Sequence, residues 1–114
     1  MSAIITEQSV KMIYSMLRKL PPFDSWGLPP AYKIKFKVLE DFKFMGELQV
    51  KPYKMTFGTK YQEHFETIVT TVAHEMIHLS LYLEGVPSYD QHRRLFKQKA
   101  KEIGSLYGFD SKWL

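Results

Sequence analysis

The sequence contains no cysteine among its 114 residues. Disulfide bonds, metal sites with thiolate ligands and thiol nucleophiles are therefore excluded. Any metal ion that this chain holds must be bound by histidine, aspartate or glutamate side chains. The chain has four histidines.

Long hydrophobic runs are missing as well. The longest apolar stretches span only a few residues, whereas a transmembrane helix needs about 20. The first stretch, MSAIITEQSVKMIY, lacks the charged head and apolar segment of a signal peptide. We therefore expect no membrane partner, no secretion signal and a cytoplasmic protein.

The composition is that of a globular protein. Hydrophobic residues make up 45% of the chain and aromatic residues 15%, which is enough apolar surface for a core. The length suits one domain, so we expect a single domain over residues 1–114. The net charge of +4 is compatible with an acidic or nucleic-acid partner but does not indicate one.

Hydrophobic periodicity predicts a helix near the N-terminus. Apolar residues recur at helical spacing over residues 5–20, and Thr6 or Ser9 can cap the start. Pro21 and Pro22 would end this helix, because proline lacks the backbone N–H that a helix interior requires.

The periodicity then changes to that of β-strands. Apolar residues alternate with lysines in YKIKFKV over residues 32–38, which predicts a strand with one buried face. Two more strands are expected within residues 42–50 and over about 53–58, with Pro52 at an edge or a bend. We expect a small antiparallel sheet of about three strands.

Helical spacing returns from about residue 61 and predicts a long helix that ends at Gly85 and Pro87. A C-terminal helix is expected from Ser88, where SYDQ has the form of a capping box, to Gly108. The order of elements predicts an α+β fold.

The long helix carries the motif HEMIH. Side chains four residues apart share a helix face with Cβ atoms about 5–6 Å apart, so His74 and His78 can bind one zinc ion. Glu75 falls beside that point, where a carboxylate can accept a proton from water and pass it to a leaving amine. The alternative is a chance arrangement inside an ordinary buried helix.

A zinc site needs a third protein ligand, and His92 is the best candidate. It follows the GVPSY turn and is expected in the first turn of the C-terminal helix, whose inward face would fold back onto HEMIH. The alternative for His92 is an exposed residue near a helix start. Asp90 is a further possible ligand, whereas Glu84 should point away from the site. His64 precedes His74 by ten residues, so on a helix it would lie on a different face.

Three histidines leave a fourth tetrahedral position for water, as in catalytic zinc sites. With Glu75 as base, the reaction class expected is metal-assisted hydrolysis, with a peptide bond as the leading substrate. Peptide is expected along an exposed strand edge, for which residues 53–58 are the candidate. Three tyrosines are candidates for stabilising an oxyanion: Tyr82, Tyr89 and Tyr107.

The stretch from about residue 70 to 109 resembles the SprT-like family of zinc metallopeptidase domains, which includes the Spartan proteases of DNA–protein crosslink repair. The resemblance rests on TVAHEMIH and on the downstream element DQHRRLF. It implies a zincin-like fold, one Zn²⁺ per chain held by His74, His78 and His92, and a catalytic role for Glu75. It also matches Asp90 and Phe96 to flanking family positions.

Two features depart from the pattern of that family. Arg93 stands where glycine is usual, and the chain lacks the cysteine zinc ribbon that many members carry after this core. The sequence therefore resembles a minimal, stand-alone core of a kind that phage genomes can encode.

Basic residues form two groups that can neutralise phosphates. The candidates for nucleic-acid binding are Lys33, Lys35, Lys37, Arg93, Arg94, Lys97 and Lys101. The alternative is a solvated surface that keeps an edge strand from pairing.

Three functions remain open at this point. The leading one is a zinc peptidase with a protein substrate. Proteins associated with DNA or with nucleoprotein complexes are one possible class of substrate. The others are a non-catalytic interaction module that keeps the zincin fold and a basic nucleic-acid-binding protein. The sequence does not indicate the oligomeric state.

Overall fold

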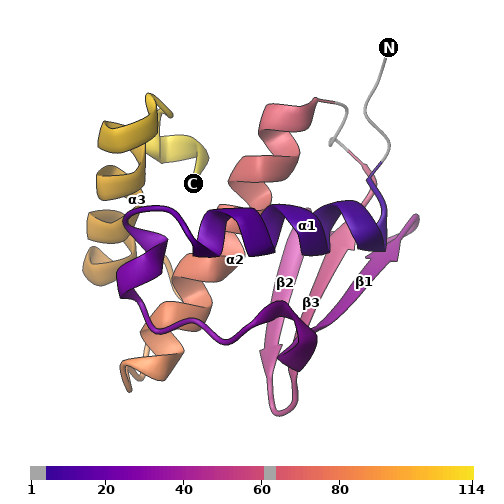
Figure 1. The fold of residues 1–114 in the computed structure, drawn as a ribbon, viewed down its shortest axis with the longest axis horizontal. Helices are drawn as coiled ribbons and strands as arrows, with labels where there is room; N and C mark the ends of the chain where they lie inside the picture. The colour runs from indigo at the N-terminus through magenta and orange to yellow at the C-terminus, as the bar shows by residue number, and fades with distance from the viewer. Residues whose placement is uncertain (1–4, 61–63) are drawn as a thin grey trace.

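A computed structural model describes residues 5–60 and 64–114 of the chain. In chain order its elements are α1 (Glu7–Arg18), η1 (Phe23–Ser25), η2 (Ala31–Lys33), β1 (Lys35–Leu39), β2 (Gly46–Val50), β3 (Tyr53–Gly58), α2 (Phe65–Leu83), α3 (Arg94–Tyr107) and η3 (Ser111–Trp113), where η marks a short 3-10 helix (Figure 1). The predicted α+β class, with a small sheet of three strands, is confirmed. None of the helices in the described ranges combines the length and the hydropathy that crossing a bilayer requires.

The sheet has the strand order β1-β3-β2, and its pairing is mixed. A tight hairpin joins β2 to β3, so these strands are antiparallel, with Gly46 opposite Phe57. β1 pairs with β3 in parallel, with Lys35 opposite Lys54. The prediction of a wholly antiparallel sheet is wrong, because the chain crosses from β1 to the far edge before the hairpin begins. The predicted edge strand at 53–58 is wrong for the same reason, since β3 is central and β2 is an edge.

The first strand is shorter than the alternation suggests. Residues 31–33 form η2 after Pro30, so Lys33 is not on the strand. Tyr32, expected on the buried face, is 78% exposed. Phe36 in β1 is buried as expected.

Helix α1 begins with a reciprocal cap. The backbone N–H of Ser9 donates to Thr6 Oγ1 at 3.0 Å, and Thr6 N–H donates to Ser9 Oγ at 2.9 Å, which satisfies two of the helix's free N–H groups. The helix is shorter than the predicted range 5–20. It is fastened to the next loop by Tyr14, whose hydroxyl donates to the backbone oxygen of Pro29 at 2.6 Å.

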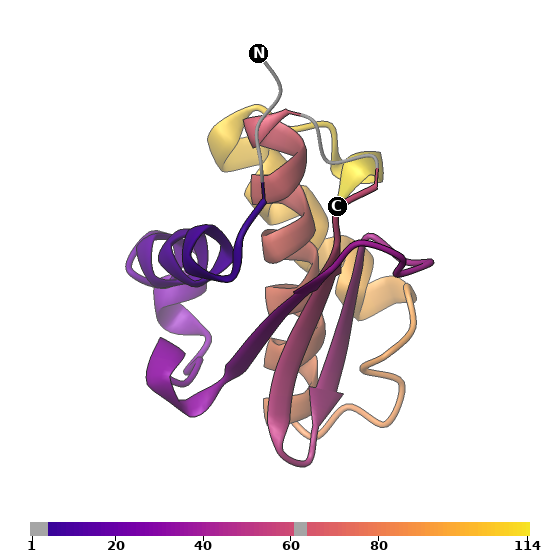
Figure 2. The ribbon, with the colours of Figure 1, turned by 90° about the vertical axis from the view of Figure 1, so that its right-hand side faces the viewer.

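Helix α2 lies between the sheet and α3 and also contacts α1 (Figure 1). This central position buries most of its circumference, including the polar residues Ser80 and Glu75. Phe65 and Leu83 are exposed because they lie at the two ends of the helix. In Figure 2, α1 and the loop between α2 and α3 lie on opposite sides of the molecule.

The C-terminal helix begins six residues later than predicted. Residues 87–90 form turns, in which Gln91 N–H donates to Ser88 O at 2.9 Å, so the SYDQ sequence does not cap a helix. Helix α3 starts at Arg94, and His92 lies in the preceding loop rather than in a first helical turn. The predicted end is confirmed, since Gly108 adopts a left-handed φ of 78°.

Candidate metal centre

Three histidines from two elements meet beside the sheet. His74 and His78 lie one turn apart on α2, and the loop after α2 brings His92 to them. The Nε2 atoms are 3.1 Å apart for His74 and His78, 3.2 Å for His78 and His92, and 3.1 Å for His74 and His92. These three residues form a group whose ligand atoms could hold one metal ion.

Backbone oxygens set the proton positions on two of the rings. His78 Nδ1 is 2.6 Å from Tyr89 O, and His74 Nδ1 contacts the backbone oxygen of Leu114. A carbonyl oxygen only accepts hydrogen bonds, so each Nδ1 must carry the proton. Burial lowers the pKa of His74 to about 4 and also lowers the pKa of His78, which keeps both rings neutral. Their Nε2 atoms therefore hold lone pairs and no hydrogen.

This donor set fits a zinc ion. The lone pairs of His74 and His78 face each other across 3.1 Å with no hydrogen between them, an arrangement that a cation would stabilise. Tetrahedral zinc with Zn–N bonds of about 2.0–2.1 Å places its ligand nitrogens about 3.3 Å apart, close to the separations observed here. Imidazoles with Nδ1 bonded to backbone carbonyls are also typical metal ligands.

The other ligand candidates lie outside this group. Glu84 is exposed and pairs with Lys99, whose Nζ lies 3.1 Å from its carboxylate. His64 occupies the exposed position before α2. Asp90 lines the cleft around the histidines but does not converge with them.

Within residues 5–60 and 64–114, Glu75 is the only residue whose carboxylate lies within 4.0 Å of a histidine nitrogen. Its Oε2 atom lies 4.0 Å from His74 Nε2, and the residue is only 4% exposed. Burial raises the pKa of Glu75 to about 8, and the negative charge of Glu47 adds to this increase. A carboxyl group whose pKa lies near neutral pH is suited to taking up and releasing protons.

Strand β2 forms one wall of a cleft of about 300 Å³ beside the histidines. The cleft is lined by Phe44, Gly46, Glu47, Leu48, His74, Glu75, His78, Tyr89, Asp90 and His92. A Cβ atom on Gly46 would lie 2.9 Å from Glu75 Oε2, so β2 approaches the helix as closely as it does only because this residue has no side chain. Gly46 was not predicted to belong to the site, although a glycine within a predicted strand is a known sign of close backbone approach.

The three candidate tyrosines take different positions. Tyr89 lines the cleft and supplies the backbone oxygen to His78. Tyr82 packs edge-on against Tyr89 and Tyr53. The hydroxyl of Tyr107 contacts the backbone oxygen of Pro21, so it is engaged elsewhere.

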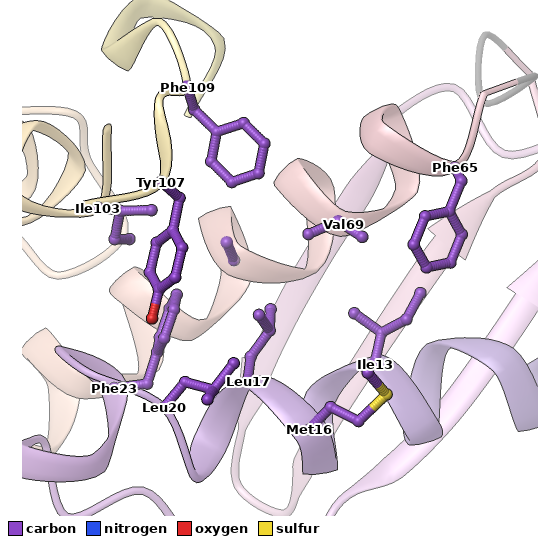
Figure 3. A pocket seen from close by; sticks show the side chains of 11 residues that line it. Ile13, Met16, Leu17, Leu20, Phe23, Phe65, Val69, Ile103, Tyr107 and Phe109 are labelled. Carbon is purple, nitrogen blue, oxygen red and sulfur yellow. The ribbon is translucent and has the colours of Figure 1, made fainter. Parts of the chain in front are cut away.

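A separate apolar pocket of about 220 Å³ lies between α1, α2 and the segment after α3 (Figure 3). Val69 and Ala73 line it from α2, and with 3.6 residues per turn they point away from the face of His78. The pocket is lined by apolar and aromatic side chains, and none of its lining residues is a histidine, aspartate or glutamate. It is distinct from the cleft.

The seven basic candidates are not gathered on one surface. Lys35 and Lys37 lie on β1, at the edge of the sheet remote from α3, with Lys33 just before it (Figure 1). The remaining four lie on or before α3 and divide between two pockets. Arg93 and Arg94 line one, and Lys97 and Lys101 line the other.

No curated protein matches the chain. The model of the SprT-like family matches residues 24–112, which is most of the sequence and includes the three histidines and Glu75. The chain belongs to the SprT-like family.

Proposed function

We propose that this protein is a zinc-dependent metallopeptidase that hydrolyses peptide bonds of a protein substrate. The observation that carries the proposal is the convergence of three histidine Nε2 atoms within 3.2 Å of one another beside a buried carboxylate. Membership of the SprT-like family supports the same reaction class.

His74, His78 and His92 would hold the zinc ion. Zinc bound there would polarise the carbonyl of the scissile peptide and lower the pKa of a water molecule. The backbone oxygens of Leu114 and Tyr89 keep His74 and His78 oriented with their Nε2 lone pairs toward the site.

Glu75 would act as the general base and then as the general acid. Its carboxylate accepts the proton of the attacking water and delivers it to the nitrogen of the leaving amine. Its buried position excludes bulk water from this transfer. Because Gly46 has no side chain, β2 leaves space for the Glu75 carboxylate at the cleft.

Strand β2 would position the substrate. It is an edge strand that lines the cleft with Gly46, Glu47 and Leu48. An extended peptide can add to such an edge through backbone hydrogen bonds, which would draw its carbonyl groups past the histidines.

Replacing the proposed base tests this function. Glu75→Gln keeps the size of the side chain but removes the proton acceptor, so we expect peptide hydrolysis to fall by at least about 10²-fold while zinc content stays at the wild-type level. Both are measured on purified protein, with a fluorescence-quenched peptide library and elemental analysis. Glu66→Gln, an exposed residue in the first turn of the same helix, is the matched control and should keep full activity. Undiminished hydrolysis by Glu75→Gln would exclude the proposed mechanism.

A further inference from the structure

A second hollow adjoins the metal centre on the other side of His92. It has a volume of about 400 Å³ and is lined by His92, Phe96, Lys97, Ala100, Lys101, Ser111, Lys112 and Leu114. His92 also lines the cleft that contains Glu75, so the two hollows meet at this residue. We call the second one the lysine pocket.

Three lysines give this pocket its charge. Lys97 and Lys101 stand one turn apart on α3, and η3 contributes Lys112. Within residues 5–60 and 64–114, neither Lys97 nor Lys101 has a carboxylate at salt-bridge distance, whereas Lys112 Nζ lies 3.5 Å from Asp110 Oδ2. Cations gathered in this way repel one another, and a bound anion would relieve the repulsion.

The base of the pocket is apolar. Phe96, Ala100 and Leu114 are each at most 5% exposed and belong to the core. Apolar surface surrounded by lysines suits a short side chain that has methylene groups and an anionic end. Aspartate and glutamate have this character.

The charge changes sign across His92. In the cleft on one side are the acidic residues Glu47 and Asp90, and in the pocket on the other side are the lysines. A substrate that passes over the histidines would therefore meet a basic wall and an acidic wall on opposite sides of the bond to be cleaved.

We propose that the lysine pocket is a substrate subsite that receives an aspartate or glutamate side chain close to the scissile bond. This inference rests on the proposed peptidase function. An extended peptide advances about 3.3 Å per residue, and His92 lines both the pocket and the cleft of the metal centre. The acidic residue therefore lies within a few positions of the cut.

A nucleic-acid backbone suits the pocket less well. Binding of a strand uses a basic groove that follows several successive phosphates. The other basic candidates do not extend the pocket into such a groove, because Lys35 and Lys37 lie at the remote sheet edge and Arg93 and Arg94 line a different hollow.

The test measures binding by zinc-loaded Glu75→Gln, which should bind peptides without cleaving them. Fluorescein-labelled peptides carry aspartate, asparagine or lysine at each position in turn, and dissociation constants come from fluorescence anisotropy at low and high salt. At one position, aspartate should bind about five- to tenfold more tightly than asparagine, and salt should weaken this preference.

Reversing the charge of two pocket lysines tests whether they cause this preference. Adding Lys97→Glu and Lys101→Glu should reverse the preference at that position from aspartate to lysine. The matched control, Lys35→Glu with Lys37→Glu at the remote edge, should keep the preference for aspartate. If the swapped protein fails to fold by circular dichroism, Lys97→Gln with Lys101→Gln should abolish the preference instead.

The outcomes separate this inference from the proposed function. An acidic preference in binding, with no hydrolysis of any peptide by the wild type, would support the subsite and contradict the peptidase. Hydrolysis and binding that are indifferent to acidic residues at every position would overturn the subsite and leave the peptidase standing. Binding of a short single-stranded oligonucleotide that the charge swap abolishes, without any acidic preference for peptides, would overturn the subsite in favour of nucleic acid.

Discussion

At the scale of single residues, the site depends on close contacts around Glu75. This carboxylate is buried, stands 4.0 Å from His74 Nε2 and lies so close to β2 that a Cβ atom on Gly46 would be 2.9 Å from its Oε2. Both its raised pKa and its position follow from burial between α2 and β2. A change that moves the carboxylate by a fraction of an ångström should therefore affect catalysis more than folding.

Gly46→Ala makes such a change. The added Cβ would lie 2.9 Å from Glu75 Oε2 and 3.1 Å from Thr71 Cγ2, so either the carboxylate or the strand must shift. We expect kcat for peptide hydrolysis to fall at least about tenfold, zinc content to stay unchanged, and the free energy of unfolding to drop by about 1–3 kcal/mol. Gln49→Ala, at an exposed position of the same strand, serves as the control. Wild-type kcat in Gly46→Ala would contradict the positioning role of this contact.

At the scale of elements, the ends and loops of the helices complete the metal centre. Helix α2 provides two ligands on one face, but the third comes from the loop that precedes α3. The backbone oxygen of Leu114, after η3, orients His74 from a distance of 40 residues along the chain. Leu114 is itself buried in the core at 5% exposure, and this burial fixes the segment that carries the oxygen.

Leu114→Ala should loosen that segment and weaken the metal site. Loss of the partner of a ligating histidine typically reduces metal affinity by about 10–100-fold. We expect the zinc affinity of Leu114→Ala to decrease by a factor in this range. Competition with a chromophoric chelator measures the dissociation constant, and denaturant unfolding of the zinc-free protein measures stability separately. Leu106→Ala, at a position that is 53% exposed, should change neither quantity appreciably. Unchanged zinc affinity in Leu114→Ala would show that His74 does not need this contact.

These elements also mark how far the sequence could predict the structure. Helical spacing identified α2, and the positions of Thr6 and Ser9 indicated the cap of α1, because both signals depend on residues close together in the chain. The start of α3 was mispredicted because SYDQ matches a capping box but forms turns. The alternation in β1 predicts which face is buried, not which strand lies alongside, so the strand order could not be inferred.

The same distinction applies to the candidate site. The HEMIH spacing places His74 and His78 on one helix face, and the family resemblance points to His92. The contacts of the Leu114 and Tyr89 backbone oxygens with the histidines could not be predicted from the sequence. Every residue has a backbone oxygen, and the fold determines which one contacts a given side chain.

At the scale of the whole molecule, the fold separates three surfaces. The cleft with Glu75 opens between α2 and β2, the lysine pocket lies beyond His92, and the apolar pocket of Figure 3 faces α1. Two of these meet at one histidine, so a single substrate can contact both. The proposed roles of the cleft and of the lysine pocket both depend on the convergence of the histidines on one metal ion.

Elemental analysis of the wild type and of His92→Ala, both purified without added metal, shows whether the three histidines hold one zinc ion. We predict about one zinc per chain in the wild type, as a three-histidine site holds a single ion, and its loss or marked weakening in His92→Ala. Absence of zinc from both proteins, even after reconstitution, would contradict the metal centre itself. Equal zinc in both would contradict the role of His92 and make Asp90, which lines the same cleft, the next ligand to replace.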